Sequence, residues 1–365
     1  MTGQTKTPRI CIVPRVSGVG GMVSFQRRLT EGLTQRGIEV CFDLNEPPYA
    51  AVLVIGGSRQ LSGLWRARRR GVRVVQRLNG MNWLHRVRYT GVKHFVRSAS
   101  GNALLAVIRA RLAHQIVYQS EFARRWWEQV YGERHVPQVV IYNGVNLDIY
   151  SPEGKGASLK ESVRLLMVEG NLMGGYEHGL EVGLDLTKRL GEHLATEKFS
   201  SSVNGVRRIE LVVAGRVSEP LRRRIESALH EQDTKGPVEI SIRWLGVVPP
   251  ERIPEIDRSA HLLFSADVNS ACPNSVIEAI ACGTPAIGFA TGALPEIINE
   301  QAGRVVPYGG NPWRLEPPNV ADLARASVEI LENLEVFRMG ARARAESMFG
   351  LDHMVESYLQ VLLER

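Results

Sequence analysis

The sequence predicts an α/β chain of two doubly wound domains, and three features carry this prediction. Short apolar, strand-like runs alternate with helical segments along all 365 residues, as in parallel sheets covered by helices. A chain of this length accommodates two domains of ordinary size. Between them, Ser151–Ser162 (SPEGKGASLKES) has the composition of a linker. We therefore expect a first domain over residues 1–150 and a second over residues 151–349.

The first domain offers a glycine-rich turn after its first strand. Strands are expected over residues 9–16, 40–43, 51–55 and 72–78. Gly18, Gly20 and Gly21 lie between the first strand and a helix expected from Val23. Glycines there let the backbone approach a ligand at a helix N-terminus. The spacing does not fit the dinucleotide fingerprint G-x-G-x-x-G, and Asp43 is the sole acidic candidate for a ribose, so an NAD-dependent enzyme is disfavoured.

The second domain contains the most informative stretch, Phe264–Ile298. Pro273 is suited to the first position of a helix, where its missing N–H is not needed. Ser275–Cys282 follows as a short apolar helix, which Gly283 closes. A buried strand comes next, and together these segments form one unit of a parallel sheet. The junction between loop and helix is a ready anion site.

Glu278 is a carboxylate within this otherwise apolar helix. It lies four residues after Asn274 and three after Ser275, so the three side chains share a face. A phosphate held by the amides of Asn274 and Ser275 would leave Glu278 positioned to accept two hydrogen bonds from a diol such as ribose. The alternative is a glutamate favoured by the helix dipole, which is worth about 0.3–1 kcal/mol.

The stretch CPNSVIEAIACGTPAIGFATGALPEII resembles the donor-site signature of family 4 glycosyltransferases, the retaining enzymes of the GT-B fold. Val139–Pro152 (VVIYNGVNLDIYSP) is similar to that family's crossover segment. The resemblance implies two Rossmann-like domains facing across a cleft, with the terminal helix, residues 350–365, crossing back onto the first. It implies that Glu278 holds the nucleotide ribose and that Glu296 shapes the pocket. Ser270 departs from the pattern, because the family has there a Glu that contacts the donor sugar.

The same resemblance implies transfer of a sugar from a nucleoside diphosphate, such as a UDP-sugar, to an acceptor hydroxyl on a glycan, a lipid-linked or a small molecule. No metal is expected. The Arg and Lys that usually neutralise the diphosphate are missing from Gly170–Glu181, so Arg216 and the amides at Asn274 and Ser275 are expected to replace them.

In the first domain, Gly20 and Gly21 would close against the phosphates. Asn79 stands where the family often has a His facing the transferred sugar, and its amide can hydrogen-bond a hydroxyl but cannot act as an acid or base. His85 lies six residues further on and is a catalytic candidate, with a structural role as the alternative.

Charge is unevenly distributed. Residues 1–150 hold 22 Lys and Arg against 8 Asp and Glu, a net charge of +14, whereas residues 151–365 hold 23 against 30, a net charge of −7. The basic half suits an anionic partner, either a bilayer with acidic lipids, a lipid phosphate or a nucleic acid. No binding motif supports nucleic acid. Ordinary solvated surface charge is the alternative.

The remaining sequence features bear on location and on competing functions. No apolar run approaches the roughly 20 residues of a membrane span, and the polar N-terminus lacks a signal-peptide core. The 4 cysteines show no metal-binding spacing. We therefore expect a cytoplasmic protein, peripheral at the inner membrane face. A nucleotide-sugar epimerase and a non-catalytic sugar-nucleotide-binding protein remain alternatives, and the sugar, base, acceptor and linkage stay open.

Overall fold

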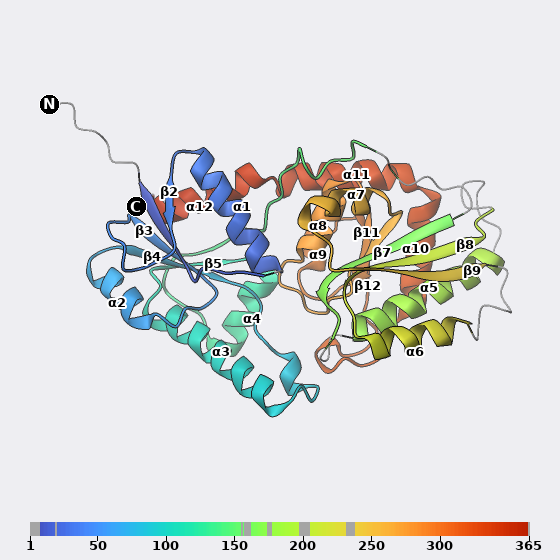
Figure 1. Ribbon diagram of the computed structural model, residues 1–365, viewed down its shortest axis with the longest axis horizontal. Helices are drawn as coiled ribbons and strands as arrows, with labels where there is room; N and C mark the ends of the chain where they lie inside the picture. The colour runs from blue at the N-terminus through green and yellow to red at the C-terminus, as the bar shows by residue number, and fades with distance from the viewer. Residues whose placement is uncertain are drawn as a thin grey trace. The chain divides into compact units, whose positions relative to one another are not determined.

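The computed structural model describes residues 8–18, 20–154, 156, 162–173, 177–196, 205–230 and 238–363. The chain divides into two compact units, which we call the first and second unit. The first comprises Met1–Gly144 and Phe349–Arg365, and the second comprises Val145–Met348. Each unit contains a twisted sheet with helices on its faces (Figure 1).

The sheet of the first unit has six parallel strands in the order β2-β1-β3-β4-β5-β6. Because helices cover a parallel sheet on both faces, its central strands are largely apolar, and all of β3 is buried. The strands are β1 Arg9–Val13, β2 Glu39–Cys41, β3 Ala51–Ile55, β4 Arg73–Leu78, β5 Gln115–Tyr118 and β6 Gln138–Val140. The helices are α1 Gly21–Gln35, α2 Leu61–Arg69, the 3-10 helix η1 Leu84–Arg86, α3 Val92–Arg111, α4 Glu121–Tyr131 and α12 Leu351–Leu363.

Helix α12 completes the core of the first unit, although it comes from the end of the chain. It packs beside α1 (Figure 1), with the rings of Phe25 and Tyr358 5.3 Å apart. Arg36 at the end of α1 forms ion pairs of 2.7 Å with Asp352 and 2.8 Å with Glu356. The apolar face of the terminal helix is therefore core packing.

The sheet of the second unit also has six parallel strands, in the order β12-β11-β10-β7-β8-β9. Its strands are β7 Ser162–Asn171, β8 Arg208–Arg216, β9 Glu239–Gly246, β10 Leu262–Phe264, β11 Ala286–Phe289 and β12 Gly303–Val306. Its helices are α5 His178–Thr196, α6 Glu219–His230, η2 Pro250–Arg252, α7 Ile253–Arg258, α8 Asn274–Ala281, α9 Leu294–Ile297, η3 Pro312–Arg314, α10 Val320–Glu332 and α11 Leu334–Met348.

The expected boundaries that differ from the structure include the start of α3 and the end of the linker. The sequence predicts a basic amphipathic helix over residues 104–114, and the structure extends this helix back to Val92. The first turns of α3 gave no helical signal because their exposed residues are apolar and their buried ones polar. Ser162, expected in the linker, is the first residue of β7. Half of that linker, residue 155 and residues 157–161, lies outside the described residues.

Candidate functional site

The second unit has a topological switch point between β7 and β10. After β7 the chain adds β8 and β9 on one side, and after β10 it adds β11 and β12 on the other, so the strand order reverses between β7 and β10. Ligands of open α/β sheets bind beyond the carboxyl ends of the strands at such a point. A hollow of about 260 Å³, open mouth included, lies there. It is lined by His178, Gly179, Val182, Phe264, Ser265, Ala266, Asp267, Val268, Phe289, Thr291 and Leu294.

Helix α8 begins at this edge of the sheet. Its N-cap is Pro273, and no side chain caps the helix there. The first amides of a helix have no partner within the helix, and here no side chain of the N-cap satisfies them. Asn274 and Ser275 are half-buried, and Glu278, one turn along, is 8% exposed. The arrangement therefore offers amide donors at the surface with a carboxylate behind them.

The loop after β11 fixes the loop that leads into α8. Gly292 has φ +60°, and a Cβ at this position would lie 2.5 Å from the backbone oxygen of Ser270. The amide of Ala293 donates to that same oxygen at 2.8 Å. A glycine is required here by both conformation and space. The glycine of the predicted signature thus holds the two loops of the site together.

Glu296 lies on α9, the short helix that follows this loop. Its side chain is half-buried, and its backbone oxygen accepts a hydrogen bond of 2.6 Å from the guanidinium of Arg344. Arg344 also donates to the backbone oxygen of Ile297 at 3.0 Å. The cation therefore neutralises the carboxyl end of α9 and fixes the helix position.

Arg216 is the last residue of β8 and lies beside the end of β7, in register with Asn171. Its side chain is exposed, and among the described residues we find no ion pair or side-chain hydrogen bond that holds it. Arg216 is thus a cation available to an anion at the carboxyl edge of the sheet. Residues 174–176, within the segment where the expected Arg and Lys are missing, lie outside the described part.

Two acidic residues at the switch point were not predicted. Glu169 is a half-buried residue near the end of β7, and Asp267 follows β10. Asp267 is open to water at the mouth of the hollow, yet protein surrounds it on its other sides. That burial raises the pKa of Asp267 to about 6, and a hydrogen bond from the Ser270 side chain opposes the shift. Burial and then the charge of Asp267 raise the pKa of Glu169 well above its usual range. The pair therefore retains a proton more readily than two isolated acids.

A third acid, Asp257, lies behind α8. It is fully buried, and neither carboxyl oxygen has a hydrogen-bond partner among the described residues. Burial, and then the charge of Glu278, raise the pKa of Asp257 well above its usual range, while Arg258 opposes the shift. Asp257 therefore retains its proton more readily than an exposed aspartate.

In the first unit, the expected site residues lie at the carboxyl edge of the sheet. Gly20, with φ 135°, is the N-cap of α1 and no side chain caps that helix; Gly21 begins it. Asn79 follows β4, and its Oδ1 accepts a 3.1 Å hydrogen bond from Arg77. The Arg77 guanidinium is fully buried and lies 3.6 Å from the centroid of the Phe25 ring. The amide group of Asn79 therefore has a fixed orientation.

His85 lies in η1 and is 5% exposed. Its ring packs edge-on against Phe95, with centroids 5.0 Å apart, and neither ring nitrogen has a partner among the described residues. Burial, followed by the charges of Arg86 and His94, lowers the pKa of His85, so the imidazole is neutral at physiological pH. Its catalytic role stays a prediction, as do the roles assigned to the other site residues.

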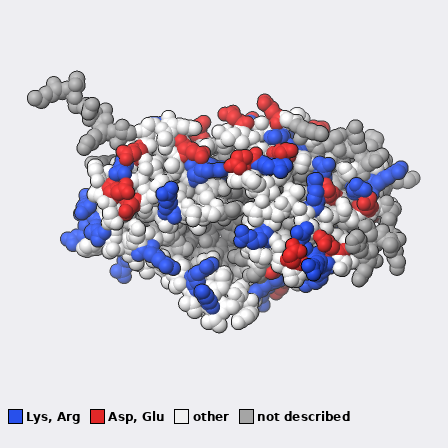
Figure 2. Space-filling view, viewed as in Figure 1, with Lys and Arg blue, Asp and Glu red and all other residues white. Residues whose placement is uncertain are grey.

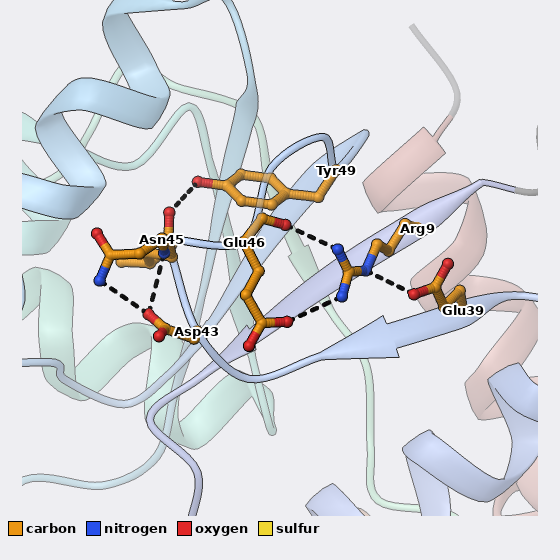
Figure 3. A network of polar contacts seen from close by, with 7 residues as sticks. Arg9, Glu39, Asp43, Asn45, Glu46 and Tyr49 are labelled. Atoms are coloured by element: carbon orange, nitrogen blue, oxygen red, sulfur yellow. Dashed lines mark hydrogen bonds and ion pairs between the residues drawn. The ribbon is translucent and has the colours of Figure 1, made fainter.

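Asp43, considered above for a ribose, belongs to a local network instead (Figure 3). Its Oδ1 accepts hydrogen bonds of 3.0 Å from both the backbone and the side-chain amide of Asn45. Nearby, Arg9 forms ion pairs with Glu39 and Glu46 at 2.8 and 2.9 Å. These contacts make Asp43 a turn-forming residue.

Three further absences concern the described residues alone. No helix there is long and apolar enough to cross a membrane. No three His, Cys, Asp or Glu side chains gather in a metal-binding arrangement within those same ranges. The four cysteines form no disulfide.

Residues 186–333 match the model of the family described as "Glycosyl transferases group 1". No curated protein matches the chain. Among solved structures, sucrose-phosphate synthase from Thermosynechococcus elongatus is similar, with 16% identity, 98% of each chain covered and a TM-score of 0.68. A glycosyltransferase from Rickettsia africae ESF-5 has 16% identity over 99% of this chain and 100% of that one, with a TM-score of 0.65. HepE from Anabaena, solved with UDP and glucose, has 16% identity over 97% and 99%, with a TM-score of 0.64.

At these identities the structural similarity shows the fold, and it confirms the predicted fold class. The family match covers the core of the second unit, including α8 and Glu278. The chain thus has the GT-B fold and, over residues 186–333, a segment that matches glycosyl transferases of group 1.

Proposed function

We propose that this protein is a retaining, family 4 type glycosyltransferase that transfers a sugar from a nucleoside diphosphate to an acceptor hydroxyl. The observation that carries the proposal is the start of α8, which has no N-cap side-chain hydrogen bond and is followed one turn on by the buried Glu278, inside the segment matched by group 1 glycosyl transferases. HepE, of the same fold, was solved with UDP and glucose, which supports a UDP-sugar as the first donor to test.

In this proposal the second unit binds the donor. The diphosphate contacts the amides of Asn274 and Ser275, and Arg216 supplies the positive charge; Glu278 accepts hydrogen bonds from the ribose hydroxyls. Glu296 shapes the pocket. A guanidinium with no ion pair among the described residues can pair with a phosphate without first giving up a protein carboxylate.

In the first unit, Gly20 and Gly21 would contact the phosphates and Asn79 would bind the sugar. His85 is a catalytic candidate. The acceptor is a glycan, a lipid-linked molecule or a small molecule. No protein nucleophile is evident, so we favour a front-face reaction. The bond between the anomeric carbon and the phosphate oxygen breaks, the acceptor oxygen bonds on the same face, and the leaving phosphate takes the acceptor proton. We expect no metal requirement.

Activity of the purified full-length chain tests this proposal. UDP-, GDP- and ADP-sugars are each incubated with the protein, and sugar release or transfer is followed. We expect turnover of one donor, lost in Glu278→Ala and kept in the control Glu335→Ala, whose carboxylate is exposed. Turnover that is insensitive to Glu278→Ala contradicts the site assignment.

One observation favours a second candidate, a non-catalytic sugar-nucleotide-binding protein. Ser270 replaces the family's sugar-contacting Glu, and the usual Arg and Lys pair is missing. Nucleotide binding at α8 with no turnover of any sugar nucleotide identifies this candidate. A nucleotide-sugar epimerase, the other alternative, would instead convert the donor without an acceptor.

A further inference from the structure

One segment of the first unit combines unpaired positive charge with exposed apolar side chains. Residues 86–97 include η1's last residue and the first turns of α3. Their exposed apolar side chains are Val87 (38%), Tyr89 (92%), Val92 (71%), Phe95 (47%) and Val96 (59%). Most other exposed large apolar residues of the described chain are scattered, as on any protein surface.

The beginning of α3 has an inverted polarity for a helix in water. Val92, Phe95 and Val96 share one face, at spacings of three and four residues, and that face is exposed. The buried side chains of these turns are polar, Ser98 and Asn102. Asn102 is held by Asn82, through hydrogen bonds of 3.0 and 2.7 Å with its backbone amide and carbonyl. A water-facing helix has the opposite arrangement, so the exposed face is suited to a partner with an apolar interior.

The charged residues of this segment are all positive, and none has a carboxylate partner in the part of the chain that the structure describes. Arg86, Arg88, Lys93 and Arg97 have no ion pair or side-chain hydrogen bond within the described ranges. Acidic partners are also far away in sequence, since between Glu46 and Glu121 the chain holds 13 Lys and Arg and no Asp or Glu. Figure 2 shows Lys and Arg without Asp or Glu along the lower edge of the first unit, where α3 runs. Elsewhere, exposed arginines such as Arg208 and Arg224 are paired with carboxylates.

We propose that residues 86–97 dock the first unit on an anionic lipid bilayer. The cations would bind lipid phosphates, while the rings and aliphatic side chains of the exposed face would enter the headgroup and acyl boundary. Charge complementarity selects an anionic partner, and the apolar face between the cations selects a bilayer over a nucleic acid. A nucleic acid presents phosphates along its surface, and exposed valines would not increase its affinity for the segment. This inference is independent of the proposed sugar transfer.

Sedimentation of the full-length chain with vesicles tests the inference. One set is phosphatidylcholine alone, and the other contains phosphatidylglycerol in addition. We expect binding to the anionic set only, weakened at high salt. In the charge variant Lys93→Gln/Arg97→Gln, affinity should fall by about 25-fold, since each cation near such a surface contributes about fivefold. The apolar variant Val92→Ser/Val96→Ser should also release the protein from the vesicles, because serine side chains do not enter the acyl boundary. Both positions are exposed, so the variant should keep its fold.

Matched controls come from the second unit. Arg207→Gln/Arg223→Gln removes two exposed cations, and Val336→Ser/Met339→Ser removes two exposed apolar side chains of 63% and 68% exposure; both should bind vesicles like the wild type. Equal binding to neutral vesicles, unchanged binding by the segment variants, or binding to duplex DNA but not to vesicles would each overturn the inference.

Discussion

Arg216 is the residue on which the electrostatics of the proposed donor site depend. It is an exposed cation at the end of β8, with no side-chain partner found among the described residues. A hydrogen bond to a charged group contributes about 1.5–3 kcal/mol. Arg216→Gln should therefore weaken binding of the nucleoside diphosphate by about tenfold to hundredfold, as measured by calorimetric titration.

The neighbouring variant Arg223→Gln controls for net charge, since Arg223 is exposed on α6. It should bind the nucleotide like the wild type. Equal losses in both variants would mean that the effect is nonspecific and that Arg216 contacts no phosphate.

Asp257 predicts a pH-dependent stability. Its folded-state pKa is raised, so the unfolded chain releases the proton at a lower pH than the folded chain does. The wild type therefore loses stability as pH rises from about 4, the unfolded pKa, toward the folded pKa, at about 1.4 kcal/mol per pH unit. Asp257→Asn removes this loss.

Thermal melts at pH 4 and pH 8 measure the effect. The Asn variant should match the wild type near pH 4 and melt at a higher temperature at pH 8. Glu335→Gln, at an exposed position, should show no such pH-dependent gain. A destabilised Asp257→Asn at pH 8 would show that the buried carboxylate is charged and partnered.

The loops around α8 depend on one close approach between backbones. In Gly292→Ala the new methyl group would lie 2.5 Å from the Ser270 oxygen, in addition to the cost of a left-handed conformation. We expect a loss of about 2–4 kcal/mol in unfolding free energy of the second unit, from backbone strain and overpacking combined. Urea titration followed by circular dichroism measures it.

Gly246→Ala is the matched control, because Gly246 has φ +65° and nothing within 4 Å of the added Cβ. It should lose only the conformational term, about 1–2 kcal/mol. Equal losses in the two variants would mean that the contact between the loops contributes nothing.

Local pattern predicted the elements that follow simple rules. The strand over Ala51–Ile55 matches β3 at both ends, because a short, valine-rich apolar run suits a strand buried on both faces better than a helix. Helix α8 was predicted to within one residue, since Pro273 and Gly283 bound it. The start of α3 was missed, because its apolar residues face outward and give no core-facing pattern.

The candidate site was only partly accessible from sequence. Glu278 and Arg216 each follow from their place on one element. The acidic pair Glu169 and Asp267 depends on β7 and β10 being neighbours, although almost 100 residues separate them. That order is a property of the sheet and not of any local pattern. Asp257 was likewise not predicted, because its burial on α7 depends on tertiary packing and not on a local pattern.

The uneven charge of the chain follows its division into units. The basic half coincides with the first unit, whose segment 86–97 carries the proposed lipid contact, while the group 1 match and the acidic pair lie in the second. We infer a division of labour in which one unit binds an anionic surface and the other a soluble anion. Loss of vesicle binding in the Lys93 and Arg97 variant should therefore leave nucleotide affinity unchanged.

Calorimetric titration of UDP, GDP and ADP into the full-length chain tests most directly whether the start of α8 binds a nucleoside diphosphate. We predict that one of them binds with a stoichiometry of one, and that Glu278→Ala weakens this binding at least tenfold while Glu335→Ala does not. Binding of none of the three, or equal affinity in wild type and Glu278→Ala, would contradict the account.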